Sequence, residues 1–229
     1  MIAVPLASDL PAKWDMGFAL DILPDILHAF LRYTLFITAL ATLLAAVLGL
    51  VFAVVRYARV PVLSQVTTGF VQFTRATPIP IQLFFVYYLL PDYGVTVGAV
   101  TTGVLVLGVH YACYFAEVYR GGIESIPPGQ WEACTALSLP QQTVWRRVVI
   151  PQAVRKILPS LGNYVISMFK EIPFLVFISV PEMVGTAKTI GGSSFRYVEP
   201  LTICGIIYLL ASYPASVAMR KLETRLEHA

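Results

Sequence analysis

Long apolar stretches recur along this chain, and each is about as long as a helix that crosses a lipid bilayer. A spanning helix needs about 20 mostly apolar residues. One stretch has Arg75 as its only charge, and another is interrupted by Lys170 and Glu171. Because an open sheet edge leaves backbone groups unpaired in lipid, we expect every span to be helical. The predicted transmembrane helices are 33–55, 62–90, 94–117, 155–180 and 200–219.

The fourth of these predictions has an alternative, because the Lys170–Glu171 pair could mark a re-entrant or interfacial segment instead of a full span. We favour the span, since apolar residues resume at Pro173 and continue through Phe177.

The composition supports a membrane protein. The chain has 229 residues, of which 57% are hydrophobic and 13% charged, whereas soluble domains carry about 25% charged residues. So little charge excludes a water-soluble enzyme, and the high hydrophobicity excludes a disordered chain. The net charge of +3 requires no nucleic-acid partner, and three cysteines cannot form a complete disulfide framework.

The orientation follows from the basic residues that flank the spans. Ten lysines and arginines lie on the side of segment 120–152 and the C-terminus, against four on the other side. Because basic residues stay in the cytoplasm, we expect the N-terminus outside and the C-terminus inside. Residues 1–31 then form an extracytoplasmic lead-in, either an amphipathic helix or an irregular segment. The fold class is an all-α membrane protein, with 1–229 as one transmembrane domain surrounded by lipid.

The segment 120–152 is the longest stretch between predicted spans. A short helix is predicted after its two prolines, with Glu132 in the first turn, where the helix dipole stabilises a carboxylate. Ser138 and Gln141 fit a capping box for a second short helix that ends at Pro151. The segment should therefore form two cytoplasmic helices that meet at a bend. Its large apolar side chains indicate a partner surface: Trp131, Leu137, Leu139 and Trp145.

Three sets of residues carry a family resemblance. The first set resembles the EAA loop of ABC-importer permeases: Gly129, Gln130, Trp131, Glu132, Ala133, Ala136 and Leu137, followed by Ile150, Pro151, Gln152 and Ala153. The second set resembles the RGTP-plus-Gln motif of the polar amino-acid uptake branch (histidine/glutamine/arginine permease-like): Thr74, Arg75, Ala76, Thr77, Pro78 and Gln82. The third set resembles the fourth span of that branch: Leu158, Pro159, Leu161, Asn163, Lys170 and Glu171. The resemblance covers about residues 14–225, and the loop's usual glycine is replaced by Ser138.

The resemblance implies a type I importer in the bacterial inner membrane, of which this chain is a multi-pass permease subunit and not an enzyme. Two permease subunits, of the same or a similar chain, form the pore. A dimer of ABC ATPase subunits binds ATP and Mg, and an extracytoplasmic solute-binding protein delivers the solute. The sequence has no GxxxxGK[ST] loop, which agrees with ATP binding by another chain. No cofactor, metal or catalytic site is expected here. The residues implied in coupling to the ATPase are Gly129, Trp131, Glu132, Ala133, Ala136, Leu137, Ser138, Leu139 and Pro151.

Polar residues recur at helical spacing within three predicted spans. Gln72, Arg75 and Gln82 lie on one face of the predicted span 62–90. His110 lies on a polar face of the span 94–117, and Ser167 lies on a polar face of the span 155–180. Ionisable residues inside a membrane usually mark a pathway or a buried pair. A translocation pathway lined by these stripes would explain them all. The residues expected along it are Arg75, Gln82, Tyr114, Glu117, Asn163, Lys170 and Glu171.

Structural explanations stay open for the same residues. Arg75 could anchor its helix by pairing with Glu117, Lys170 and Glu171 could neutralise each other, and the serines could form interhelical hydrogen bonds. The predicted solute is a polar amino acid or a related zwitterion, including a compatible solute such as ectoine.

The alternative function is an ion-coupled secondary transporter of small polar solutes, in which Glu171 or His110 carries a proton. The small number of spans and the absence of an inverted repeat in the sequence argue against it. An intramembrane enzyme is a third possibility, which the lack of a metal motif disfavours.

Overall fold

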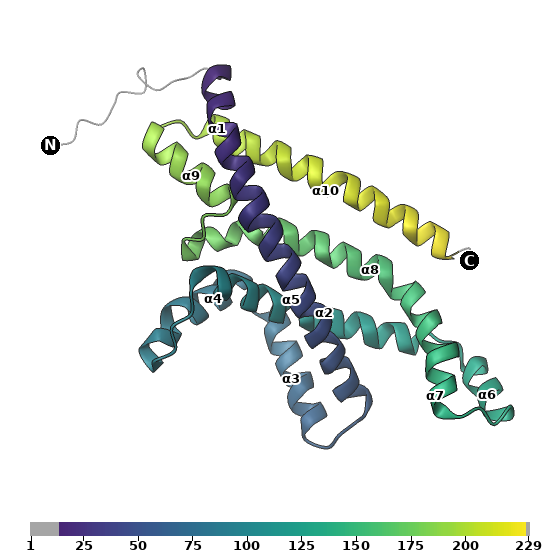
Figure 1. The fold of residues 1–229 in the computed structure, drawn as a ribbon. Helices are drawn as coiled ribbons and strands as arrows, with labels where there is room; N and C mark the ends of the chain where they lie inside the picture. The colour runs from purple at the N-terminus through teal and green to yellow at the C-terminus, as the bar shows by residue number, and fades with distance from the viewer. Residues whose placement is uncertain (1–13, 228–229) are drawn as a thin grey trace.

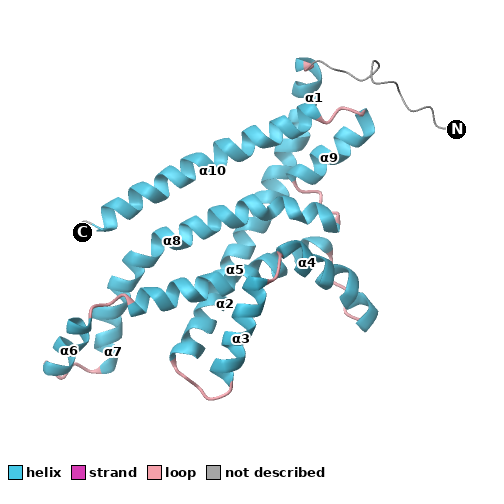
Figure 2. Cartoon of the chain, turned by 180° about the vertical axis from the view of Figure 1, so that it is seen from behind, coloured by secondary structure: helices cyan, strands magenta, loops and turns pink. Residues whose placement is uncertain are grey.

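The computed structural model describes residues 14–227, so the predicted lead-in 1–31 is described only from residue 14. The regular structure of this part of the chain is helical and contains no strand, which confirms the all-α class (Figures 1 and 2). The α-helices are α1 (Met16–Ala29), α2 (Phe36–Tyr57), α3 (Leu63–Ala76), α4 (Ile79–Phe84), α5 (Ala99–Glu124), α6 (Pro128–Ala136), α7 (Gln141–Thr143), α8 (Ile150–Glu171), α9 (Met183–Ser194) and α10 (Val198–Glu227). Short stretches of other helix types join them: π-helical η1 (Phe30–Leu35), η2 (Phe85–Leu89) and η4 (Val144–Val149), and 3₁₀-helical η3 (Leu90–Tyr93) and η5 (Ile172–Ile178).

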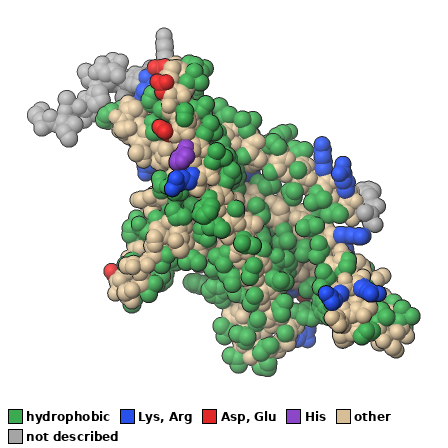
Figure 3. Space-filling view, viewed as in Figure 1, with side chains coloured by type: hydrophobic (Ala, Val, Ile, Leu, Met, Phe, Trp, Pro, Cys, Tyr) green, Lys and Arg blue, Asp and Glu red, His purple; other side chains and the backbone are tan. Residues whose placement is uncertain are grey.

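Within residues 14–227, four helical runs are long and apolar enough to cross a membrane, where five were predicted. They are Met16–Tyr57, Ala99–Glu124, Gln141–Ile178 and Val198–Leu226. Each overlaps one predicted span, whereas the predicted span 62–90 has no counterpart among them. Apolar side chains cover much of the face in Figure 3, and blue Lys and Arg side chains gather near α6 and the end of α10.

The missing span is a broken helix. α3 ends at Ala76, Thr77 is extended (φ −101°, ψ 131°), and α4 begins after Pro78. Proline disfavours a helical conformation in the residue before it and has no backbone N–H to donate. The prediction of one continuous helix over 62–90 is therefore wrong, because it was made from hydropathy and Pro78 is itself apolar.

The first helical run is longer than predicted. α1, η1 and α2 form one helix over Met16–Tyr57, so the helix begins well before the predicted span 33–55. Of the two alternatives for the lead-in, its described part is helical, and α1 buries Ala19, Ile22 and Ile26 against α9 and α10. Figure 1 shows this purple helix crossing the molecule as the continuation of α2.

The centre of the molecule is the close pair α2–α5. A Cβ atom added to Gly49 would meet the Cβ of Phe115 at 2.7 Å and the carbonyl oxygen of Ala112 at 2.9 Å. Small residues allow such a close approach, which is how membrane helices gain packing contacts. This core holds α5 in place, and α5 carries the polar side chains described next.

The segment 120–152 also differs from its prediction. A helix follows the two prolines, as expected, but the second helix does not end at Pro151 and instead runs on as one helical stretch over Gln141–Ile178. Pro151 is the second residue of α8 and directly follows the π-helical η4, so the helix passes through this proline at a change of helix type. The segment is thus joined rigidly to the third spanning helix.

Candidate functional site

One carboxylate near the end of α5 gathers arginines from three helices. Arg56 Nη1 on α2 donates to Glu117 Oε1 at 2.6 Å, and Arg120 Nη2 donates to Oε2 at 2.7 Å. Arg75 Nη1, in the last turn of α3, lies 3.8 Å from Oε1, and Arg120 also pairs with Glu124 at 2.6 Å. We call these five residues the Glu117 cluster. It brings together the predicted pair Arg75 and Glu117, and its three arginines outnumber its two carboxylates.

Of the three arginines in the Glu117 cluster, Arg75 has the weakest contact with Glu117. Both oxygens of Glu117 already accept short hydrogen bonds from other arginines. The side chain of Arg75 is 38% exposed, against 13% for Arg56. Its guanidinium carbon lies 4.9 Å from the ring centroid of Tyr114. A guanidinium on an aromatic face can still use its N–H edge to bind a carboxylate through two parallel hydrogen bonds.

A group of aromatic rings continues from Tyr114. The ring centroids of Tyr114 and Tyr164 are 5.1 Å apart, and those of Tyr111 and Tyr114 are 5.9 Å apart. The Tyr111 hydroxyl donates to Glu171 Oε2 at 2.6 Å. The group therefore links Arg75 on α3 with Glu171 at the end of α8. Tyr111 and Tyr164 were missed by the sequence analysis, although the i, i+3 spacing of Tyr111 and Tyr114 was a signal.

Gln82 occupies a different place from the one predicted. The break after α3 removes it from the helix face of Arg75, and its amide turns back toward that break. Nε2 lies 2.9 Å from the carbonyl oxygens of Thr74 and Thr77, to which it donates, and 3.0 Å from Nδ1 of His110. The side chain is thus engaged by the protein's own backbone.

The polar stripe on α8 forms an open face. Asn163, Ser167 and Lys170 are exposed, and the Ser167 hydroxyl donates to the carbonyl oxygen of Asn163. The expected neutralisation of Lys170 by Glu171 is absent among the ion pairs of the described residues, since Glu171 accepts from Tyr111 instead. Adjacent residues on a helix point about 100° apart, which explains why the two charges do not meet.

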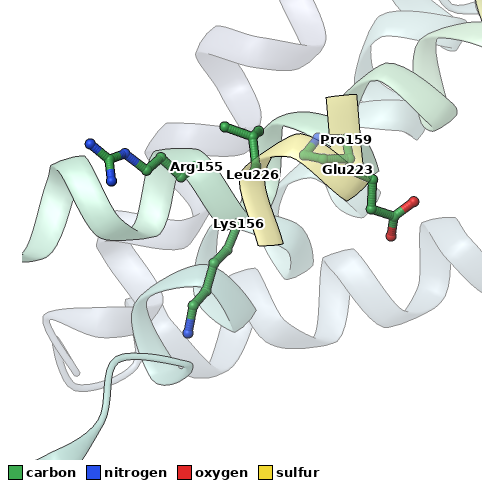
Figure 4. A pocket seen from close by; sticks show the side chains of 5 residues that line it. All are labelled: Arg155, Lys156, Pro159, Glu223 and Leu226. Carbon is green, nitrogen blue, oxygen red and sulfur yellow. The ribbon is translucent and has the colours of Figure 1, made fainter. Parts of the chain in front are cut away.

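A pocket of about 410 Å³ lies elsewhere, between the start of α8 and the end of α10. Figure 4 shows that the charged tips of Arg155, Lys156 and Glu223 point in different directions. None of the residues predicted along the pathway lines it. A groove of about 560 Å³ between α3, α4 and α5 includes Gln82 but is almost wholly apolar.

The helix α6 presents one exposed face. Glu132, Ala133, Ala136 and Leu137 are exposed, and Leu137 is 70% exposed. Cys134 is buried on the opposite side. The remaining predicted coupling residues Gly129, Ser138 and Pro151 are also exposed, and Leu139 is half-buried.

Three expectations for this segment need correction. Trp131 is less exposed than expected: it is half-buried and packs edge-on against Trp145 with centroids 5.9 Å apart. Glu132 lies beyond the first turn of α6, which begins at Pro128, so the helix dipole acts on it less than predicted. Ser138 caps no helix: its φ is +48°, a left-handed conformation that glycine adopts most easily.

Comparison with known proteins gives consistent results. Residues 45–228 match the family model described as "Binding-protein-dependent transport system inner membrane component". A probable amino-acid ABC transporter permease protein, y4tG of Sinorhizobium fredii, is 41% identical over 218 residues, covering 93% of this chain and 94% of that protein.

Two solved structures are similar. A chain from the crystal structure of an amino acid ABC transporter with histidines has a TM-score of 0.87 and 30% identity, covering 93% of this chain and 99% of its own. A chain from an inward-facing MetNI methionine ABC transporter has a TM-score of 0.70 at 18% identity, covering 88% of this chain and 96% of its own, and shows the shared fold alone.

Proposed function

Because the chain belongs to the family of binding-protein-dependent transport system inner membrane components, we propose that it passes polar amino acids or related zwitterions across the membrane. It is a membrane-spanning permease subunit of an ABC importer, located in the inner membrane, and the alternative of an ion-coupled secondary transporter is not supported. The relatives named as amino-acid transporters support this class of solute.

The proposal about the solute rests on Arg75, whose contact with Glu117 is weak. The solute's carboxylate binds the guanidinium edge of Arg75 through two hydrogen bonds, an arrangement that Lys cannot reproduce. Its ammonium group lies against the faces of Tyr114 and Tyr164 and near Glu171, where π-electrons and a carboxylate both attract a cation. Glu117 belongs to the pathway as the residue that holds Arg75 in place.

The exposed stripe on α8 faces a second permease subunit, of the same or a similar chain. Asn163 and Lys170 then line the pathway between the two chains. The whole chain 1–229 forms one transmembrane domain, with the predicted orientation of its termini.

The exposed face of α6 docks into an ATPase subunit. Ala133 and Ala136 allow close approach, Leu137 supplies the apolar contact, and Glu132 meets a cation on the partner. Because α7, η4 and α8 form one helical stretch, movement of the ATPase passes directly to the pathway. A pair of ATPase subunits binds ATP and Mg and hydrolyses the ATP, and an extracytoplasmic binding protein delivers the solute.

The solute contact is tested in vesicles that contain the permease, the ATPase and the binding protein. Arg75→Ala should raise the KM for amino-acid uptake by about 30-fold, the effect of removing one partner of a charge pair. Arg75→Lys should restore only part of the affinity. The matched control is Arg32→Ala, because Arg32 also lies over a tyrosine ring, at 5.8 Å, away from the site. An unchanged KM for Arg75→Ala in a fully assembled complex contradicts the proposal.

The orientation has its own test. A cysteine introduced at Glu124, which is exposed, should resist membrane-impermeant thiol reagents in intact cells and react once the membrane is opened. Rapid labelling in intact cells would reverse the topology.

A further inference from the structure

The break between α3 and α4 exposes backbone groups in the middle of a predicted span. The carbonyl oxygen of Phe73 accepts from the Thr77 hydroxyl at 2.8 Å, and that of Thr74 accepts a long backbone bond from Thr77 N at 3.3 Å. The third carbonyl at the break is that of Thr77, the residue whose backbone is extended. Away from water, such groups need partners from side chains. Arg75 lies between two of these residues, so whatever closes the break also determines where Arg75 points.

Gln82 closes the break. Its Nε2 lies 2.9 Å from both carbonyl oxygens, those of Thr74 and Thr77. Two carbonyl acceptors require a donor, so the amide nitrogen, and not the amide oxygen, faces them. Thr74 is 5% exposed, so water does not replace Gln82 there.

His110 completes the arrangement from α5. Its Nδ1 lies 3.0 Å from the same Gln82 nitrogen, and its side chain is buried at 6% exposure. An amide nitrogen only donates, so Nδ1 must be the acceptor and carry no proton. Three acceptors share the two hydrogens of the amide. His110 is also one helical turn from Tyr114, the ring on which Arg75 lies.

We propose that Gln82, with His110 as its acceptor, is a positioning residue that fixes the last turn of α3 so that Arg75 lies over Tyr114. The two side chains tie α3, α4 and α5 together at one point. Gln82 is therefore not a solute ligand, although it lies within the motif that contains Arg75. The effect on solute affinity rests on the proposed function, whereas the effect on the position of residue 75 does not.

Matched substitutions of His110 give the sharpest test, because Asn places its amide oxygen near the position of Nδ1 and Gln places it near that of Nε2. The assembled importer in vesicles is supplied with whichever radiolabelled amino acid it imports fastest among L-glutamine, L-histidine, L-arginine and L-glutamate. His110→Leu and His110→Gln should raise KM by about tenfold, because the Gln82 amide then loses the acceptor on α5 that fixes its orientation. His110→Asn should rescue the affinity, and Gln82→Ala should behave like His110→Leu. In an Arg75→Ala background, none of these changes should raise KM further.

A second measurement does not depend on the solute. In an Arg75→Cys variant, the cysteine's rate of reaction with a small cationic thiol reagent reports how firmly the last turn of α3 is held. His110→Gln should speed this reaction severalfold, and His110→Asn should leave it unchanged. Equal KM values and equal labelling rates for the Asn and Gln variants overturn the positioning role. A normal KM for Arg75→Ala overturns the solute contact instead, and a labelling difference would still support the positioning role.

Discussion

Two ion clusters of this chain use similar residues in opposite proportions. In the Glu117 cluster, three arginines surround two carboxylates, and the side chain of Arg75 stays 38% exposed. In a second cluster, which we call the Glu199 cluster, Arg196 bonds to Glu199 at the start of α10 and lies 3.6 Å from Asp15, the N-cap of α1. The side chain of Glu199 is 3% exposed, and its Oε1 also accepts from the backbone N of Asp15.

The difference distinguishes a cluster that only holds the fold together from one that can also bind an anion. The Glu199 cluster connects two helix starts and the loop before α10, and its carboxylates outnumber its arginine. Among the described residues it has no excess cation to offer, so we expect its role to be structural. The Glu117 cluster is also held together by short hydrogen bonds, but Arg75 lies 3.8 Å from Glu117 and is 38% exposed, whereas Arg56 and Arg120 bond to Glu117 at 2.6 and 2.7 Å. A cation that the fold leaves partly unmatched can bind an anion that passes by.

Removing the central carboxylate should have the largest effect. Glu117→Gln leaves three arginines close together without their common partner, and breaking a largely buried pair costs about 3 kcal/mol. The amount of folded protein and its Tm in detergent should both fall strongly. Glu124→Gln is the matched control, because Glu124 is 60% exposed and pairs, among the described residues, with Arg120 alone, and an exposed pair contributes about 1 kcal/mol or less. Equal effects of the two substitutions would mean that Glu117 is not the centre of the cluster.

Blocking α6 should abolish coupling while leaving both clusters intact. Ala133→Trp places a large side chain on the exposed face, and Glu132→Lys reverses its charge. Both should reduce ATPase retention and solute-stimulated ATP hydrolysis, with a Tm for the permease close to that of the wild type. Cys134→Trp is an informative contrast, since Cys134 is buried beneath the helix and its substitution should lower Tm instead. Normal stimulated hydrolysis in both surface variants would refute the docking assignment.

The Glu199 cluster should affect stability without affecting the solute. Arg196→Gln removes the guanidinium that contacts Glu199 and Asp15, so Tm should fall, though less than in Glu117→Gln. The KM for uptake should stay that of the wild type. A raised KM with an unchanged Tm would remove the contrast between the two clusters.

A smaller, pH-dependent effect is expected at Glu182, the N-cap of α9. Burial raises the pKa of this carboxyl from its ordinary value of 4.5 to about 7, although it accepts hydrogen bonds from the backbone N–H of Val184 and Gly185. A raised pKa means that the folded protein binds the proton more tightly than the unfolded chain does. Stability is therefore highest below pH 4.5 and is lost as pH rises toward 7.

The Tm of the wild-type protein, measured between pH 5 and pH 8, should show this decline. Glu182→Gln, which cannot ionise, should flatten it. An equal slope in both proteins would assign the pH dependence to other groups.

Prolines show what could be predicted from the sequence and what could not. Hydropathy located four of the spans, because length and apolarity alone determine them. It missed the break at Pro78, since the apolar run continues through it and the carbonyls that it frees are satisfied by Gln82 from the next turn. Pro151 is the opposite case: it was predicted to end a helix, but the helical stretch Gln141–Ile178 passes through it directly after the π-helical η4.

The site was predictable in its residues but only partly in its contacts. Spacing on one helix predicted that Tyr114 and Glu117 share a face, and Arg75 does meet Glu117. Arg56 was only one of the ten basic residues that orient the chain, because its meeting with Glu117 depends on how closely α2 packs on α5 around Gly49. Such packing between distant segments leaves no periodic signal in the sequence.

The central claim, that Arg75 binds the solute's carboxylate, is tested most directly by comparing an imported amino acid with its carboxamide, which lacks that charge. Binding of the labelled amino acid to the assembled permease–ATPase complex is measured without the binding protein, while unlabelled acid or amide competes. The wild-type complex should bind the acid about 30-fold more tightly than the amide, and Arg75→Ala should bind the two almost equally. An undiminished preference for the acid in Arg75→Ala would contradict the account, because the carboxylate would then be recognised elsewhere.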